Sequence, residues 1–146
     1  IILVNKWDLA SGTNVSAELY KEDMYTEFKD LQHYPILFVS ALTKRRVSNV
    51  LEKAWETFTK QKEKLSTKDL NVWIEKAVKN YPPPATQGKS IKIKFVEQVQ
   101  QSPPIFALFS NYPKLISIQY LRYLHNQLRE SFDLKGITIK FSLRKG

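Results

Sequence analysis

Short apolar runs and longer amphipathic stretches alternate over the first 65 residues of the chain. Residues 1–4 and 36–39 are continuously apolar, a pattern typical of strands buried in a parallel sheet. Apolar residues at helical spacing follow each run, over residues 19–31 and 47–58. We expect Ser48 to cap the second of these helices. The order β-α-β-α predicts part of an α/β fold with a parallel sheet.

From residue 66 onward the pattern changes to alternating strands and two longer helices. Alternation at Ile91, Ile93 and Phe95, with lysines between them, predicts a half-buried strand. The Pro82-Pro83-Pro84 run should end the preceding helix, because proline lacks the N–H that a helix needs. This order, α-β-β-α-β, predicts an α+β fold with helices on one sheet face. The expected elements are a helix over 66–81, strands over 89–95 and 105–109, a helix over 118–132 and a strand over 137–144, with a polar loop over 98–104.

The helical stripes identify the expected core. Trp55 and Trp73 both fall on apolar stripes, so we expect them to pack inside the protein rather than to stack on nucleobases. Tyr120 and Tyr123 are further candidates for base stacking, and for Tyr112 and Tyr123 both roles stay open. The last helix should turn its apolar positions inward, namely Ile118, Leu121, Leu124, Leu128 and Phe132.

Composition excludes several functional classes. The chain has 146 residues and no Cys, and its two histidines, His33 and His125, are far apart, so we expect no disulfide partner and no metal site. No apolar run approaches the roughly 20 residues of a membrane helix. The opening also lacks the basic segment of an export signal. We therefore expect a cytoplasmic protein with no membrane partner.

Charge is distributed unevenly between the two halves. Residues 1–65 carry ten basic and nine acidic side chains, whereas residues 66–146 carry 13 and five. The net charges of +1 and +8 together give the +9 of the whole chain. A strongly basic half favours a polyanionic partner such as RNA through counterion release. A basic domain that is merely soluble remains the alternative.

The first apolar run ends in Asn5-Lys6-Trp7-Asp8, which matches the Asn-Lys-X-Asp base-recognition motif of guanine-nucleotide-binding domains. Guanine presents N1–H and an amino group side by side, and the Asp8 carboxylate can accept from both. Asn5 would brace the loop, and the stem of Lys6 would lie across the ring. In the alternative interpretation Asp8 is a helix N-cap and Asn5 a loop residue. The second apolar run ends in Ser40, Ala41 and Leu42, where a backbone N–H would reach guanine O6.

The phosphate-binding part of a GTPase is missing from these residues. A phosphate-binding loop needs G-x-x-x-x-G-K-[ST], and none of the four glycines begins one; an Asp-x-x-Gly switch is also missing. We therefore expect this chain to be catalytically incompetent alone. Its opening Ile1–Val4 is expected to be an internal strand, cut from the half that holds phosphate and Mg²⁺.

The whole chain resembles the carboxyl-terminal part of the bacterial Der/EngA GTPase family. The segments that carry this resemblance are NKWDL, PILFVSALT, STKDLN, YPPP, KIKFVEQVQQSPPIFALFSN and YLRYLHNQLRESFDLKGITIKFSLRKG. It implies a partial P-loop GTPase-type sheet over residues 1–64 and a KH-like domain over residues 65–146. It also implies a full-length parent that binds GTP or GDP, uses Mg²⁺ only with the missing P-loop half, and hydrolyses GTP during late assembly of the large (50S) ribosomal subunit. The implied partners are the large subunit with its rRNA and the parent's own G domains.

The basic half offers candidates for contact with RNA or the ribosome. Ordinary KH domains clamp nucleic acid with a Gly-x-x-Gly loop, which this chain lacks. A solvated sheet face and a surface that packs on a G domain are alternative uses of these charges. A stand-alone RNA-binding module with a degenerate nucleotide-binding platform is the alternative for the whole chain. The candidates are the sheet stripe Lys92, Lys94, Lys140 and Arg144, and the helix residues Arg122 and Arg129.

Overall fold

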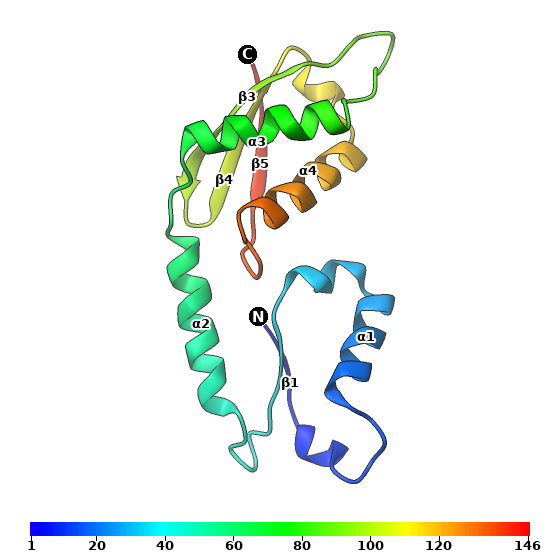
Figure 1. Ribbon diagram of the computed structural model, residues 1–146, viewed down its shortest axis with the longest axis vertical. Coiled ribbons are helices and arrows are strands. Elements are labelled where there is room, and N and C mark those ends of the chain that lie inside the picture. Colours follow the sequence, from blue (N-terminus) through cyan, green and yellow to red (C-terminus); the bar gives the residue numbers. More distant parts are fainter. The chain divides into compact units, whose positions relative to one another are not determined.

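A computed structural model describes all 146 residues, which form two compact units, Ile1–Lys60 and Gln61–Gly146 (Figure 1). Strands and helices alternate in the first unit, and a separate sheet with two helices makes up most of the second. The mixed architecture predicted from the sequence, a small parallel sheet followed by a KH-like arrangement, is confirmed. Each unit is described by itself below.

The first unit is built on two parallel strands, β1 and β2. They pair in register from Ile2 opposite Ile36 to Val4 opposite Phe38. Ile36 and Phe38 are buried, so β2 is a buried strand as predicted. Leu3 is 48% exposed, so the prediction of a buried strand is wrong for β1. With only two strands in this sheet, β1 has a partner on one side alone. The elements are β1 (Ile2–Val4), the 3₁₀ helix η1 (Trp7–Ala10), α1 (Ala17–Glu27), the 3₁₀ helix η2 (Lys29–His33), β2 (Ile36–Phe38) and α2 (Val47–Gln61).

An aromatic cluster holds α1 against this sheet. The ring of Trp7 lies 4.4 Å from that of Phe38 and 5.5 Å from that of Tyr20, which belongs to α1. Ser16 caps α1 by accepting a hydrogen bond from the Leu19 N–H. The cluster therefore fixes the loop after β1, because Trp7 begins η1.

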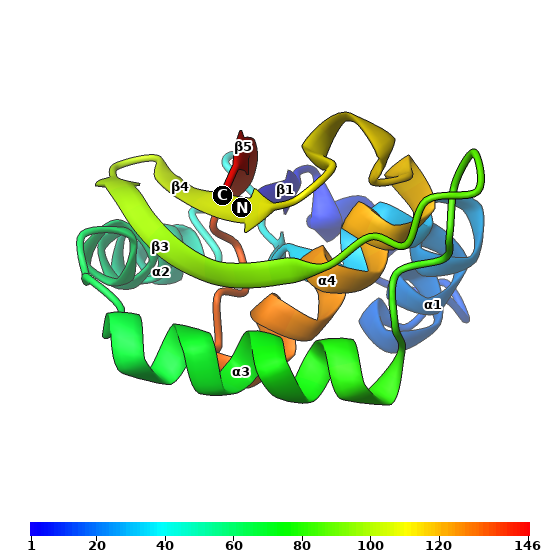
Figure 2. The same ribbon diagram turned by 90° about the horizontal axis from the view of Figure 1, so that it is seen from above.

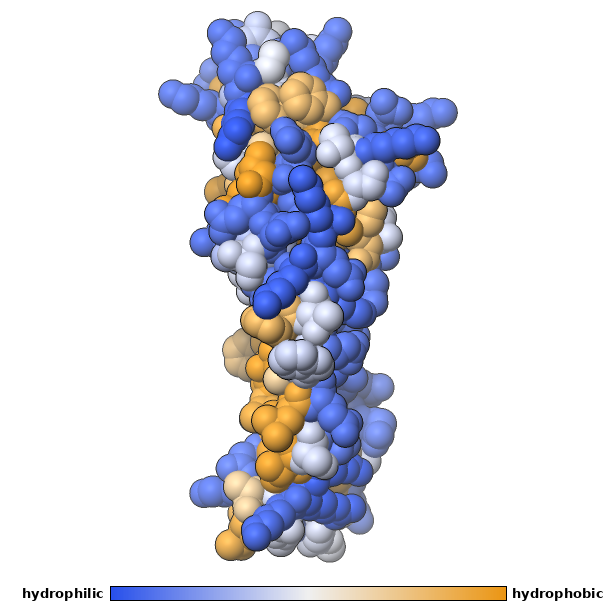
Figure 3. Space-filling model, turned by 90° about the vertical axis from the view of Figure 1, so that its left-hand side faces the viewer, coloured by the Kyte–Doolittle hydropathy of each residue, from blue (hydrophilic) through white to orange (hydrophobic).

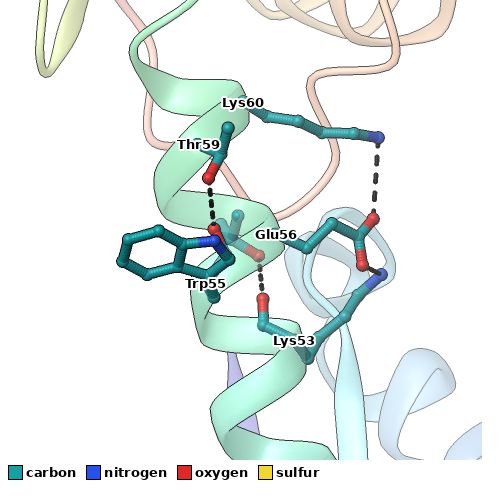
Figure 4. Close-up of polar contacts among 6 residues, drawn as sticks. Lys53, Trp55, Glu56, Thr59 and Lys60 are labelled. Atoms are coloured by element: carbon teal, nitrogen blue, oxygen red, sulfur yellow. Dashed lines mark hydrogen bonds and ion pairs between the residues drawn. The ribbon is translucent and has the colours of Figure 1, made fainter.

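The helix α2 differs from its prediction at two points. It begins at Val47, so Ser48 lies within its first turn and is not its N-cap. It buries no residue, and Trp55 is 70% exposed, so the prediction that Trp55 packs in a core is wrong for this chain. Figure 3 shows a column of exposed hydrophobic residues, in orange, on this side of the molecule. On the other side of α2, Glu56 pairs with Lys53 at 2.7 Å and Lys60 at 3.7 Å, while the Trp55 ring projects away (Figure 4).

The second unit is a three-stranded sheet covered on one face by two helices (Figure 2). Strand order is β3-β4-β5, with β3 antiparallel and β5 parallel to the central β4. Ser66 and Ser117 cap the two helices through their hydroxyl groups. The elements are α3 (Thr67–Asn80), β3 (Ile93–Gln101), β4 (Pro104–Ser110), the 3₁₀ helix η3 (Pro113–Leu115), α4 (Ile118–Ser131) and β5 (Lys140–Lys145).

Strand β3 lies further along the chain than predicted. The polar stretch expected to be a loop from Gln98 onward continues the strand, because β4 satisfies its backbone groups. Gln98 is buried, and its amide accepts from the Leu65 N–H at 2.7 Å and donates to the Gln100 carbonyl. The side chain of Asn71 joins α3 to this strand through two hydrogen bonds with the backbone of Val96. Side-chain amides thus take up backbone groups of β3 at Val96 and Gln100.

The core of the second unit lies between the sheet and α3 and α4. The last helix buries Tyr120, Leu124 and Leu128, which are four residues apart and so share one face. The prediction that Ile118 points inward is wrong: it is 68% exposed, at the first position of the helix. Trp73 is buried as predicted. Other core residues are Leu70, Ile74, Ala77, Ile91, Val96, Phe106, Leu108, Ile116, Leu134, Ile137 and Ile139.

Candidate functional site

The structure brings together the two predicted guanine-binding segments of the first unit. Asn5 follows β1, and its Oδ1 accepts hydrogen bonds from the backbone N–H of Lys6 at 2.8 Å and of Ala41 at 3.1 Å. Ala41 lies just beyond β2. Because parallel strands in register end at the same edge, their following loops meet there. The Asn5 side chain thus joins the loop after β1 to the loop after β2.

Lys6 gives the loop its turn. Its φ of 60° lies in the left-handed region, which a non-glycine residue adopts at a cost. The following Trp7 N–H donates to the Val39 carbonyl at 3.0 Å, so the loop is tied back to the end of β2 directly after the turn. The backbone of the motif is thereby held on both sides of Lys6.

Asp8 is held inside this loop with an unpaired acceptor. Its Oδ1 is buried and has no hydrogen-bond partner. The N-cap position of η1 is Lys6, without a side-chain cap, and Asp8 is the second residue of that 3₁₀ helix. The alternative interpretation of Asp8 as an N-cap is therefore not what the structure shows. A buried carboxylate oxygen without a donor is costly, and such atoms call for an explanation.

The segment after β2 forms a tight turn. Ser40 is buried, and its Oγ accepts from the Thr43 N–H at 3.2 Å, while its own N–H donates to the Arg45 carbonyl. The Ala41 N–H, which was a candidate donor to a purine oxygen, is directed to Asn5. All residues of this turn after Ser40 are exposed, Leu42 at 85%.

In the second unit, the sheet face away from the helices carries aromatic and basic side chains. The Phe95 and Phe109 rings stack 4.1 Å apart at 13°, and the Arg144 guanidinium lies 6.0 Å from the Phe109 ring. Arg144 is paired with Phe109 and Lys140 with Ile105, so both basic residues share this outer face. We call Phe95, Phe109, Lys140 and Arg144 the outer-face cluster.

Of the predicted basic stripe, Lys140 and Arg144 lie together on the outer face of the sheet. A register shift between Ile93 and Phe95 moves Phe95 to the outer face, where it is 38% exposed, and leaves Lys94 without a partner in the ladder. Lys92 precedes β3, and its backbone pairs with Asn111. The stacked phenylalanines were missed because the shift is not visible in the alternation of residue types.

The two helix arginines lie elsewhere. Arg122 and Arg129 belong to α4, whose buried residues share a core with Phe106 and Leu108 of the inner sheet face. The helix and the outer-face cluster thus lie on opposite sides of the sheet. Arg122 is exposed, whereas Arg129 is half-buried.

The tyrosines of α4 have structural partners. The Tyr120 hydroxyl donates to the Tyr81 carbonyl and the Tyr123 hydroxyl to the Ala77 carbonyl, each at 2.9 Å. Burial raises the pKa of Tyr120 well above the ordinary value of 10.0, with further increases from the nearby Tyr123 and Tyr81. Burial also raises the pKa of Tyr123. The two tyrosines thus join α4 to the end of α3. Their role in this structure is packing between helices rather than stacking on nucleobases.

Two further observations concern ligand classes. No helix of the structure combines the length and apolarity needed to cross a bilayer. No three acidic, His or Cys side chains are grouped so that they could hold a metal ion.

The fold is a small parallel α/β unit followed by an α+β unit of KH-like architecture. A family model described as "KH-domain-like of EngA bacterial GTPase enzymes, C-terminal" matches residues 64–144. The chain belongs to this family of EngA bacterial GTPases.

Relatives named GTPase Der match nearly the whole chain. The protein of Amoebophilus asiaticus is 41% identical over 145 residues, which are 99% of this chain and 34% of the relative. That of Flavobacterium johnsoniae is 39% identical over 99% of this chain and 33% of its own length. That of Fusobacterium nucleatum is 42% identical over 97% of this chain and 32% of its own length. The chain thus spans about a third of the length of these curated relatives.

Proposed function

We propose that this chain is the guanine-reading end and the KH-like domain of a GTPase that acts in late assembly of the large ribosomal subunit. The first unit selects the base of GTP or GDP, and the second contacts rRNA. The family membership and the relatives named GTPase Der support the GTPase part of this proposal. The ribosomal partner and a cytoplasmic location come from the resemblance described above.

The unpartnered carboxylate of Asp8 is the observation that carries base selection. Guanine N1–H and its amino group are adjacent donors, and Asp8 Oδ1 is a buried acceptor without a donor. Adenine offers no such pair, so it would leave the acceptor unsatisfied. Asn5 holds the Ala41 segment to the loop that carries Asp8, and Lys6 is exposed for contact with the ring.

The residues present fit the base of the nucleotide but not its phosphates. The Asn5, Lys6, Asp8 and Ser40–Leu42 segments would hold guanine. Phosphate and Mg²⁺ require a glycine-rich loop that these residues do not contain. In the parent protein, GTP hydrolysis would supply the free-energy change that switches its grip on the ribosomal particle.

The charge of the second unit supports RNA contact. Residues 66–146 carry a net charge of +8, and Lys140 and Arg144 lie on the same sheet face as the exposed Phe95 and the half-buried Phe109. Aromatic rings beside cations bind single-stranded nucleic acid by stacking and charge neutralisation. The outer-face cluster is therefore the surface proposed for rRNA.

A base-specificity switch tests the nucleotide part of the proposal. The variant Asp8→Asn is made in the full-length parent, and GTP and xanthosine triphosphate are compared as ligands. Xanthine has a carbonyl oxygen where guanine has its amino group, so the amide introduced by Asp8→Asn would donate where the native carboxylate accepts. We expect GTP affinity to fall by at least 100-fold and xanthosine triphosphate affinity to rise. Asp23→Asn, on the exposed surface of α1, is the control.

Unchanged GTP affinity in Asp8→Asn would contradict guanine reading by this residue. A parent without a Walker-type loop before Ile1 would instead favour the alternative, a stand-alone RNA-binding module with a degenerate nucleotide platform.

A further inference from the structure

A basic cavity lies in the KH-like unit, and none of the guanine-binding or RNA-contact candidates assigned above lines it. It has a volume of about 580 Å³, within the usual range for ligand sites. Three chain segments line it: the turn before β3, the residues after β4 and the end of β5. No side chain that lines it is acidic. We call it the Tyr112 pocket; its lining includes Lys89, Asn111, Tyr112, Lys114, Leu115 and Lys145.

The first wall of the pocket is a closed turn. Thr86 and Lys89 exchange both backbone hydrogen bonds, at 3.0 and 3.1 Å. Gln87 and Gly88 between them have φ values of 54° and 70°, which are the left-handed conformations of a tight two-residue turn. Lys89 is therefore presented from a defined backbone rather than from a long loop.

Asn111 ties this wall to the second one. Its Oδ1 accepts from the Lys92 N–H at 2.8 Å, and its Nδ2 donates to the Ser90 carbonyl at 2.9 Å. The third wall is held by the Gly146 N–H, which donates to the Ser110 carbonyl at 3.1 Å. Because hydrogen bonds fix all three walls, a ligand would find the site formed and would pay little for ordering it.

The chemistry of the lining combines one aromatic face with three ammonium groups. The Lys89 Nζ lies over the Tyr112 ring, 5.0 Å from its centre, so a base would stack on that face once Lys89 turns towards a phosphate; Tyr112 is 39% exposed. Leu115 and Pro113 add apolar surface beside the ring. An apolar floor with an aromatic ring suits a nucleobase, and lysine ammonium groups suit phosphates.

Three lysines in the lining of one pocket exceed what a single monophosphate needs, so they fit successive phosphates of a strand. An acidic peptide would use the lysines but leave the aromatic floor without a matching group.

We propose that the Tyr112 pocket binds one nucleotide of a single-stranded RNA, with its base on the Tyr112 ring and its flanking phosphates at Lys89, Lys114 and Lys145. This rests on the proposed RNA contact of the KH-like unit and adds a site distinct from the outer-face cluster.

Binding of fluorescein-labelled pentauridylate to the 146-residue chain, followed by fluorescence anisotropy across a salt series, tests the proposal. Uridine is used because the guanine-binding residues do not select it. The triple variant Lys89→Gln/Lys114→Gln/Lys145→Gln should weaken binding at least tenfold and lower the salt slope by about 2, since each phosphate contact on a single strand contributes about 0.7. Tyr112→Ala should weaken binding about tenfold, and Tyr112→Phe less than twofold, because stacking needs the ring and not the hydroxyl.

The matched control is Lys68→Gln/Lys76→Gln/Lys79→Gln, which removes the same charge from the exposed side of α3. It should change the affinity less than threefold. An equal loss of affinity in the control variant would overturn the proposal, because binding would then depend on total charge and not on the Tyr112 pocket. Competition by uridine monophosphate or hexaglutamate as effective as by unlabelled pentauridylate would also overturn it.

Two outcomes separate this inference from the proposed function. If the chain binds large ribosomal subunits but not pentauridylate, the pocket is wrong and the ribosomal function stands. If it binds pentauridylate through the pocket but does not bind the subunits, the pocket stands and the ribosomal function falls.

Discussion

The Asn5 Oδ1 accepts a hydrogen bond from the Ala41 backbone N–H at 3.1 Å, across 36 positions of sequence. The same oxygen accepts from the Lys6 N–H, at the residue where the chain turns through a left-handed conformation. One side chain thus joins the two loops that carry the guanine-binding residues. The Asn5 amide therefore holds the two loops together without a bound nucleotide.

Replacing Asn5 with Ala should destabilise this pair of loops. Loss of two backbone partners costs about 1–2 kcal/mol, at roughly 1 kcal/mol for each hydrogen bond. Hydrogen exchange at the Lys6 and Ala41 amides measures the effect, and both amides should exchange faster. Asn14→Ala, in the exposed loop before α1, is the control. Unchanged exchange at Ala41 would contradict the bracing role of Asn5.

The first unit should be less stable than the second. Its helix α2 buries no residue, and its sheet has only two strands, whereas the second unit buries two helix faces against three strands. Buried apolar area is the main source of folding free energy, so the difference should be large. Hydrogen exchange should show lower protection at Val39 than at Leu108, and equal protection would contradict this account.

Tyr120 should make the second unit sensitive to alkali. Its pKa is raised in the folded state, so folding favours the protonated phenol. That contribution is fully present below about pH 10, the pKa of an unfolded tyrosine, and is lost as the pH rises above it. Urea unfolding followed by fluorescence in a Trp7→Phe/Trp55→Phe background, where Trp73 is the one tryptophan, should therefore show falling stability from about pH 10 to about pH 11.5.

In Tyr120→Phe this alkaline loss should be smaller, although the variant loses about 1 kcal/mol with its hydrogen bond to Tyr81. Tyr112→Phe, at an exposed ring, is the matched control. An identical pH dependence in wild type and Tyr120→Phe would show that another group is responsible.

Local signals in the sequence predicted much of the fold. The serine caps at Ser66 and Ser117 precede clear helical stripes, and the apolar run at Ile36–Phe38 is continuous, so these elements follow from short-range chemistry. The motif at Asn5–Asp8 is also local, because all of its members lie in one loop. Parallel pairing then brought it to the Ala41 turn.

Features that depend on distant partners could not be predicted in the same way. The polar end of β3 is a strand because β4 pairs with it, and the buried Gln98 is satisfied by Leu65. Phe95 faces outward because of a register shift that alternation does not encode. The Tyr112 pocket joins three segments that are far apart in sequence, so no local pattern marks it.

Binding to purified large ribosomal subunits tests the central proposal most directly. The 146-residue chain is compared with Lys140→Glu/Arg144→Glu, which reverses two charges of the outer-face cluster, and with Lys76→Glu/Lys79→Glu on α3 as the matched control. We expect wild type and control to bind with a steep salt dependence and the outer-face variant to bind at least tenfold more weakly. Absence of wild-type binding, or equal losses in both variants, would contradict the account.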